Sequence, residues 1–280
     1  MTEDFSAVRL ELESRSEAPG LVRAALAGVA EQLDLDSELF DDLKTAVSEA
    51  CNNVVLYAYD GKPGPLAVEL EIGPQGIAAS IRDWGGGIQQ VGPSDERMGV
   101  GLAVISALAD RAEFITDPQG GTEVRMAFTG GRQSIRPVET GSEADPVGDP
   151  PVRLTGDVVV TLWPAAPLLS GVLGRVTRAV AARTHLSLDR FSDLYLVSDA
   201  IAAFLQSAAG TSPIVFAVAG GDRRLELTVG PFPPGEGARL IESGLSDGHG
   251  SPIALRVAEL AVELAEDSEV LRVVIDDRRR

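Results

Sequence analysis

Glu49 and Asn53 are four residues apart within the segment Ala46-Val47-Ser48-Glu49-Ala50-Cys51-Asn52-Asn53. Residues at this spacing lie on one face of a helix, with about 5–6 Å between their Cβ atoms. That face would present a carboxylate, which can act as a general base, and a neutral amide oxygen, which is a ligand for a hard cation. The pair therefore predicts proton transfer beside a bound cation.

Three glycine clusters follow this pair along the chain. They are Asp83-Trp84-Gly85-Gly86-Gly87, Met98-Gly99-Val100-Gly101 and Gly120-Gly121-Thr122. Glycine allows the backbone to turn sharply and to come close to a ligand, which we expect of Gly85 and Gly87. Free N–H groups at the start of a helix attract phosphate, and we expect Gly99 and Gly101 to open such a helix. An acid, an amide and three glycine clusters in this order indicate a nucleotide-phosphate site.

Asp83 follows an apolar segment that has the pattern of a strand. A carboxylate at a strand end can accept a hydrogen bond from the exocyclic amino group of adenine, which guanine lacks at that place. We therefore expect Asp83 to select ATP over GTP; the alternative is an ordinary turn aspartate before glycines. Thr122 is expected to support the adenine pocket through a hydrogen bond to Asp83 or to a water. The predicted cofactors are ATP and Mg²⁺, with the side-chain oxygen of Asn53 as the metal ligand.

Glu49 and Arg97 each allow two interpretations. Glu49 can accept the proton of an attacking hydroxyl group, or it can orient a water in the shell of the metal. Arg97 can contact the γ-phosphate, where developing charge needs compensation, or it can be a solvated loop arginine. Cys51 lies between the helix residues of interest and is expected to pack in the core.

Hydrophobic periodicity predicts the elements that position these residues. Alternation at 8–12 predicts a strand, and apolar stripes predict helices over 18–33 and from about 36 to 57, with Asp36 or Ser37 as the cap. Strands are expected at 66–72 and 77–81, a helix at 100–110, and two further strands at 112–117 and 122–128.

The second half repeats this order of elements after a segment, 130–151, that is rich in Gly, Pro, Ser and Glu and is typical of a linker. Helices are expected at 168–182 and up to about 208, strands at 214–219 and 224–229, then a helix at 252–265 and a strand at 269–275. We interpret this as a tandem duplication, the alternative being two unrelated α/β domains. Asp199 then matches Glu49, but Ala203 matches Asn53, so the oxygen ligand is lost.

The bulk properties exclude several classes. A net charge of −18 over 280 residues argues against a general nucleic-acid binder and against docking on anionic lipid. The single cysteine allows no disulfide within the chain. We see neither a signal peptide at the first residues nor an apolar run of about 20 residues, the length of a membrane span, and we expect a cytoplasmic protein.

Residues 5–130 resemble the ATP-binding domain of the GHKL superfamily, which includes DNA gyrase, histidine kinases and MutL. The nearest likeness is to bacterial anti-sigma factor serine/threonine kinases. Four motifs carry it in the family order: Glu49-Ala50-Cys51-Asn52-Asn53, Asp83-Trp84-Gly85-Gly86-Gly87, Glu96-Arg97-Met98-Gly99-Val100-Gly101-Leu102 and Gly121-Thr122. The run Val54-Val55-Leu56-Tyr57-Ala58-Tyr59 is similar to the apolar run ending in Tyr of these kinases.

The resemblance implies an α+β fold, a two-layer sandwich of a mixed, mostly antiparallel sheet with helices on one face, duplicated in tandem. Residues 1–130 would form the ATP-binding kinase domain, 131–151 a linker, and 152–280 a degenerate copy without the nucleotide-site residues. By the same resemblance Glu49 is the catalytic base, and single-domain relatives pair with themselves. The degenerate copy would then serve as a partner within the chain, in a pseudo-dimer, or the chain would form a homodimer.

The leading hypothesis for function is an anti-sigma type kinase. It would transfer the γ-phosphoryl group of Mg-ATP to a serine of a small anti-sigma-antagonist protein, or sequester a sigma factor, or both. A non-catalytic, ATP-gated protein-binding switch is the alternative. A gyrase- or MutL-like ATPase is disfavoured, because those enzymes use a lysine from a following domain and residues 152–280 contain no lysine.

Overall fold

The computed structural model describes residues 6–74, 76–86, 96–118, 120–129, 149–163, 165–208, 212–241, 256–265 and 268–277. The chain divides into two compact units. The first comprises Met1–Arg23 and Leu33–Gly148, and the second comprises Ala24–Gln32 and Asp149–Arg280. The predicted linker falls mostly on 130–148, outside the described residues.

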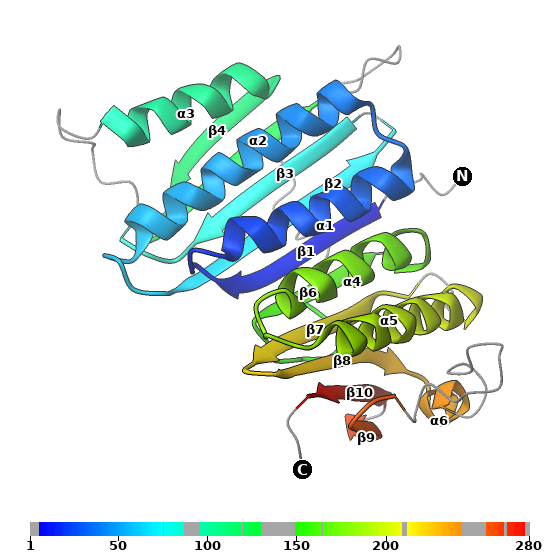
Figure 1. Cartoon of the computed structure of the whole chain (residues 1–280). Coiled ribbons are helices and arrows are strands. Elements are labelled where there is room, and N and C mark those ends of the chain that lie inside the picture. The colour runs from blue at the N-terminus through cyan, green and yellow to red at the C-terminus, as the bar shows by residue number, and fades with distance from the viewer. Residues whose placement is uncertain are drawn as a thin grey trace. The chain divides into compact units, whose positions relative to one another are not determined.

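Five antiparallel strands form the sheet of the first unit, in the order β4-β5-β3-β2-β1, and helices cover one of its faces (Figure 1). This arrangement confirms the predicted two-layer α+β fold. Along this part of the chain, the elements are β1 (Ser6–Glu13), α1 (Ala18–Leu33, of which Ala24–Gln32 belong to the second unit), α2 (Ser37–Asn53), the π-helix η1 (Val54–Ala58), β2 (Pro65–Gly73), β3 (Gly76–Asp83), α3 (Glu96–Leu108), β4 (Arg111–Thr116) and β5 (Thr122–Phe128).

Helix α2 follows directly from its sequence pattern. The Asp36 carboxylate caps it by accepting hydrogen bonds from the backbone N–H groups of Glu38 and Leu39, which satisfies two of the amides that a helix start leaves free. A buried stripe then faces the sheet, and it includes Cys51. Burial raises the pKa of the Cys51 thiol to about 12, so the group stays protonated and serves as a core side chain.

Five antiparallel strands also form the sheet of the second unit, in the order β6-β7-β8-β10-β9, and helices α4 and α5 lie against one face (Figure 1). The elements are β6 (Val158–Trp163), α4 (Ala165–Ala181), α5 (Leu188–Ala208), β7 (Ile214–Gly221), β8 (Arg224–Phe232), α6 (Glu236–Arg239), β9 (Glu259–Ala265) and β10 (Ser268–Asp276). Strand for strand, this order matches that of the first unit, which supports the interpretation as a tandem duplication.

The helix predicted over 252–265 is wrong for its second half. Residues 259–265 form strand β9, which pairs with β10, and 252–255 lie outside the described residues. In the strand, Glu259, Ala261 and Glu263 alternate with Leu260, Val262 and Leu264. Alanine, leucine and glutamate also favour helices, so only the alternation distinguishes the two structures.

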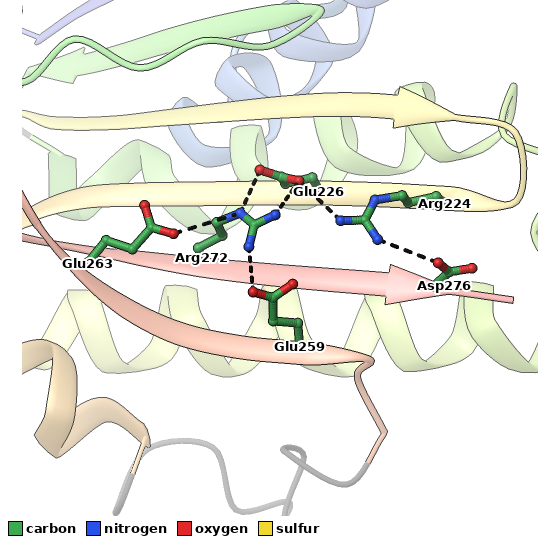
Figure 2. A network of polar contacts seen from close by, with 6 residues as sticks. All are labelled: Arg224, Glu226, Glu259, Glu263, Arg272 and Asp276. Atoms are coloured by element: carbon green, nitrogen blue, oxygen red, sulfur yellow. Dashed lines mark hydrogen bonds and ion pairs between the residues drawn. The ribbon is translucent and has the colours of Figure 1, made fainter. Parts of the chain in front are cut away.

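An ion-pair network ties β8, β10 and β9 together on the sheet face that points away from the buried leucines of β8 (Figure 2). Arg272 of β10 binds Glu226 of β8 with two hydrogen bonds, of 2.7 and 2.9 Å, and Glu259 of β9 with one of 2.6 Å. Arg224 lies 3.5 Å from Glu226 and 3.4 Å from Asp276. Hydrogen bonding to Arg272 lowers the pKa of Glu226, so the network holds this carboxylate in its charged form.

Among the helices that the structure describes, none combines the length and the apolar composition needed to cross a bilayer.

Candidate functional site

The side chains of Glu49 and Asn53 on α2 face Gly101 of α3, a residue without a side chain. The two helices pack along one another (Figure 1), and α3 turns the Cα of Gly101 toward the pair. A Cβ placed on Gly101 would lie 3.2 Å from Asn53 Oδ1, 3.3 Å from Asn53 Nδ2 and 3.5 Å from Glu49 Oε2. A glycine thus leaves open the space next to a carboxylate and an amide, a space that any other side chain would enter.

The amide nitrogen of Asn53 is buried and has no hydrogen-bond partner within the part of the chain that the structure describes. A buried amide N–H group without a partner is costly, and because it can only donate, it suits an acceptor such as a phosphate oxygen. No group of three or more His, Cys, Asp or Glu residues that could hold a metal occurs among the described residues. Mg²⁺ commonly takes few protein ligands, with phosphates and waters in its remaining positions, so the single side-chain oxygen of Asn53 suits it.

Asp83 lies at the end of β3, opposite Thr122 of β5, and is only 5 % exposed. Its Oδ1 accepts a hydrogen bond of 2.9 Å from the backbone N–H of Gly85. Burial raises the pKa of Asp83, while hydrogen bonds from the backbone N–H groups of Gly85 and Thr122 lower it in part. Thr122 thus contacts Asp83 through its main-chain N–H, and its support of an adenine pocket stays a prediction. The carboxylate is a fixed, largely buried acceptor at the end of the central strand of this sheet.

Comparison with known proteins identifies this arrangement. Residues 12–128 match the family described as the histidine kinase-like ATPase domain. The anti-sigma F factor of Caldanaerobacter subterraneus subsp. tengcongensis is 33 % identical over 135 residues, which are 45 % of this chain and 94 % of the relative. The chain belongs to the histidine kinase-like ATPase domain family.

Further relatives cover the same share of the chain. The anti-sigma F factor of Thermoanaerobacter sp. (strain X514) is 32 % identical over 129 residues, 42 % of this chain and 90 % of the relative. The crystal structure of the RsbU and RsbW domains of Rv1364c from Mycobacterium tuberculosis shares 26 % identity and covers 45 % of this chain and 34 % of that chain, with a TM-score of 0.35. A score this low contributes nothing to the account of the fold.

In this ATPase domain, two of the glycines serve the packing of backbone on backbone. A Cβ on Gly85 would collide with the carbonyl oxygen of Ala58, at the end of η1. Gly121, at φ +104°, lies against the carbonyl group of Asp83. The close approach predicted for Gly85 is therefore an approach to the chain itself, and it fixes the turn that follows Asp83.

Gly99 and Gly101 do not start helix α3, so that part of the prediction is wrong, although Gly99 still lies in its first turn. Helix α3 begins at Glu96, so both glycines lie inside it. The free N–H groups of its first turn belong to residues 96–99. Arg97 lies in this turn, and its phosphate contact stays a prediction because its side chain is not described. Gly87 lies outside the described residues.

Sequence reasoning missed two features of the site. It gave no role to Tyr59, whose hydroxyl group contacts the turn after Asp83; the apolar run ending in this tyrosine was the available signal. It also missed Gly235-Glu236-Gly237 in the second unit, whose two glycine N–H groups donate to the buried carboxylate of Glu269 at 2.8 and 2.9 Å. In the second unit, Glu269 thus accepts hydrogen bonds from the backbone amides that follow β8.

Proposed function

We propose that this chain is a Mg-ATP-dependent serine/threonine protein kinase of the anti-sigma type. The observation that carries the proposal is the convergence of Glu49 and Asn53 on the bare Cα of Gly101, with the amide nitrogen of Asn53 lacking a partner among the described residues. An acid and an amide on one helix face supply the two functions that phosphoryl transfer needs from the protein, a proton acceptor and a metal ligand.

Each residue has a distinct role in the proposed reaction. Asn53 would hold Mg²⁺ through Oδ1, and the cation would supply positive charge to neutralise the phosphates. Glu49 accepts the proton of a serine or threonine hydroxyl, whose oxygen forms a bond to the γ-phosphorus while the bond from this phosphorus to the β–γ bridging oxygen breaks, releasing ADP. Asp83 accepts a hydrogen bond from the adenine amino group. Arg97, at the start of α3, is proposed to contact the γ-phosphate.

The names of the relatives support the choice of partner. The two relatives described above are anti-sigma F factors, and they match along 94 % and 90 % of their own length. We propose accordingly that the substrate is an anti-sigma-antagonist protein and that the chain also sequesters a sigma factor. The proposed site of action is the cytoplasm.

The second unit is proposed to be a degenerate ATPase domain over residues 152–280. Its strand order repeats that of the first unit. On α5, the positions that match Glu49 and Asn53 are Asp199 and Ala203, so the amide ligand is missing. The amides after β8 bind Glu269. This unit keeps the framework and is proposed not to bind nucleotide.

The proposal is tested with Glu49→Gln. Transfer of labelled phosphate from ATP to candidate antagonist proteins should be lost, while calorimetry shows ATP binding within about twofold of the wild type, because the substitution removes the proton acceptor and keeps the shape. Glu38→Gln, an isosteric change at an exposed position in the first turn of the same helix, is the matched control. Unaltered transfer by Glu49→Gln would refute the base assignment. A wild-type protein that binds ATP and transfers no phosphate would instead be a non-catalytic ATP-gated switch.

A further inference from the structure

Tyr59 joins three segments of the first unit through one hydroxyl group. It follows the π-helix η1, donates a hydrogen bond of 2.5 Å to the carbonyl of Pro65 at the start of β2, and accepts one of 2.8 Å from the backbone N–H of Trp84. Trp84 is the residue directly after Asp83. The hydroxyl therefore uses both its donor and an acceptor site to bind main-chain groups.

The turn after Asp83 is fixed at three consecutive amides, each with an acceptor of its own. The N–H of Trp84 donates to Tyr59, that of Gly85 to the Asp83 carboxylate, and that of Gly86 to the carbonyl of Ala58 at 2.9 Å. Two of these three acceptors belong to neighbouring residues, Ala58 and Tyr59, at the end of the segment that begins with α2. Hydrogen bonds thus connect the turn after Asp83, which is proposed to contact adenine, with the end of the segment whose helix α2 carries Glu49 and Asn53.

The tyrosine ring itself is held in place. Gly64 faces it so closely that a Cβ there would lie 2.5 Å from the ring. Burial raises the pKa of Tyr59, so its hydroxyl keeps the proton that it donates to Pro65 throughout the physiological range. Ring and hydroxyl are separable features, because a phenylalanine would keep the first and lose the second.

We infer that Tyr59 is a positioning residue for nucleotide specificity: its hydroxyl holds the Trp84 amide and so fixes the direction in which the Asp83 carboxylate meets the base. The inference rests on the proposed function, in which Asp83 takes adenine. Tyr59 itself touches neither nucleotide nor metal in this scheme. Tyr59 contributes through the shape of the turn, so loss of its hydroxyl should weaken the binding only of ligands that carry a base.

The test is Tyr59→Phe, with Tyr195→Phe as the control. Tyr195 is a half-exposed tyrosine of α5 in the second unit, far along the chain from the site. Calorimetry should show that Tyr59→Phe weakens binding of Mg-ATP about five- to tenfold, the effect of one lost hydrogen bond, and lowers the preference for ATP over GTP. Binding of Mg-tripolyphosphate, which has no base, should stay unchanged. In transfer assays the KM for ATP should rise while kcat at saturating ATP holds.

The loss of affinity for Mg-ATP, compared with that for Mg-tripolyphosphate, decides the outcome even if the variant is less stable. A folding defect weakens ATP and tripolyphosphate alike, and an equal loss for both would overturn the inference, as would wild-type affinity for ATP. A wild-type protein without preference for ATP over GTP would instead contradict the assignment of Asp83 in the proposed function, and it is measured first.

Discussion

The Cα of Gly101 faces the Asn53 side chain across the contact between α3 and α2, and a Cβ added to it would lie 3.2 Å from the amide oxygen. That distance is shorter than an ordinary carbon–oxygen contact. At Gly99, two residues earlier, no atom of the described residues outside the helix's own backbone lies within 4 Å of the corresponding position. The two glycines therefore form a natural pair for testing whether the space beside Asn53 belongs to a ligand.

Gly101→Ala should weaken Mg-ATP binding about tenfold or more, because the methyl group presses on the groups proposed to meet the cation. Gly99→Ala should leave binding unchanged. Both substitutions favour the helix by about 1 kcal/mol, so neither is expected to unfold α3. Titration calorimetry with Mg-ATP compares them, and equal binding by both variants would show that the space is not used.

Asp83→Asn should reduce the preference for ATP over GTP by about 10- to 100-fold, the range expected when a charged hydrogen-bond acceptor is lost. The substitution keeps the shape of the side chain and its ability to accept from the N–H of Gly85. Binding titrations with ATP, ADP and GTP, with and without Mg²⁺, give the preference directly. If the ratio of ATP to GTP affinity does not move, adenine is recognised elsewhere.

Gly85→Ala should destabilise the first unit by about 1–3 kcal/mol and abolish ATP binding, because its Cβ would collide with the main-chain carbonyl oxygen of Ala58. Gly86→Ala is the matched control, since the described residues place no atom within 4 Å of its Cβ position. Thermal unfolding and ATP titration of the two variants provide the measurements. A Gly85→Ala protein as stable as Gly86→Ala would mean that η1 shifts to accommodate it.

Much of this site follows from local sequence. The spacing of Glu49 and Asn53 places them on one helix face, the alternation of β3 places Asp83 at a strand end, and Asp36 marks the start of α2. These are short-range rules, and the structure agrees with them. The fold class also follows, since the order of strands and helices leaves few ways to bury both apolar faces.

The parts that sequence could not provide depend on contacts between segments far apart in the chain. Gly101 was expected to open a helix, yet the helix begins at Glu96 and the glycine is required by residues of α2. Gly85 is needed because a Cβ there would collide with the carbonyl of Ala58, and the hydroxyl of Tyr59 accepts a hydrogen bond from the N–H of Trp84. Strand β9 was read as a helix because its composition fits both, and pairing with β10 decides between them.

The network around Arg272 makes the stability of the second unit sensitive to acid. Because the folded protein lowers the pKa of Glu226, this carboxylate contributes stability above its unfolded pKa, and the contribution is lost as the pH falls through the lower folded value. Glu226→Gln should therefore lower the melting temperature of the second unit by about 2–4 °C at pH 7, a modest effect because solvent screens the pair. The difference from the wild type should shrink as the pH falls below about 4, near the ordinary pKa of glutamate.

Glu263→Gln is the control, since this carboxylate lies 3.9 Å from Arg272, at the limit of an ion pair. Calorimetric scans at pH 7 and pH 3 give both differences, and a deficit of Glu226→Gln that is the same at the two values would show that its bonds to Arg272 act through shape and not through charge.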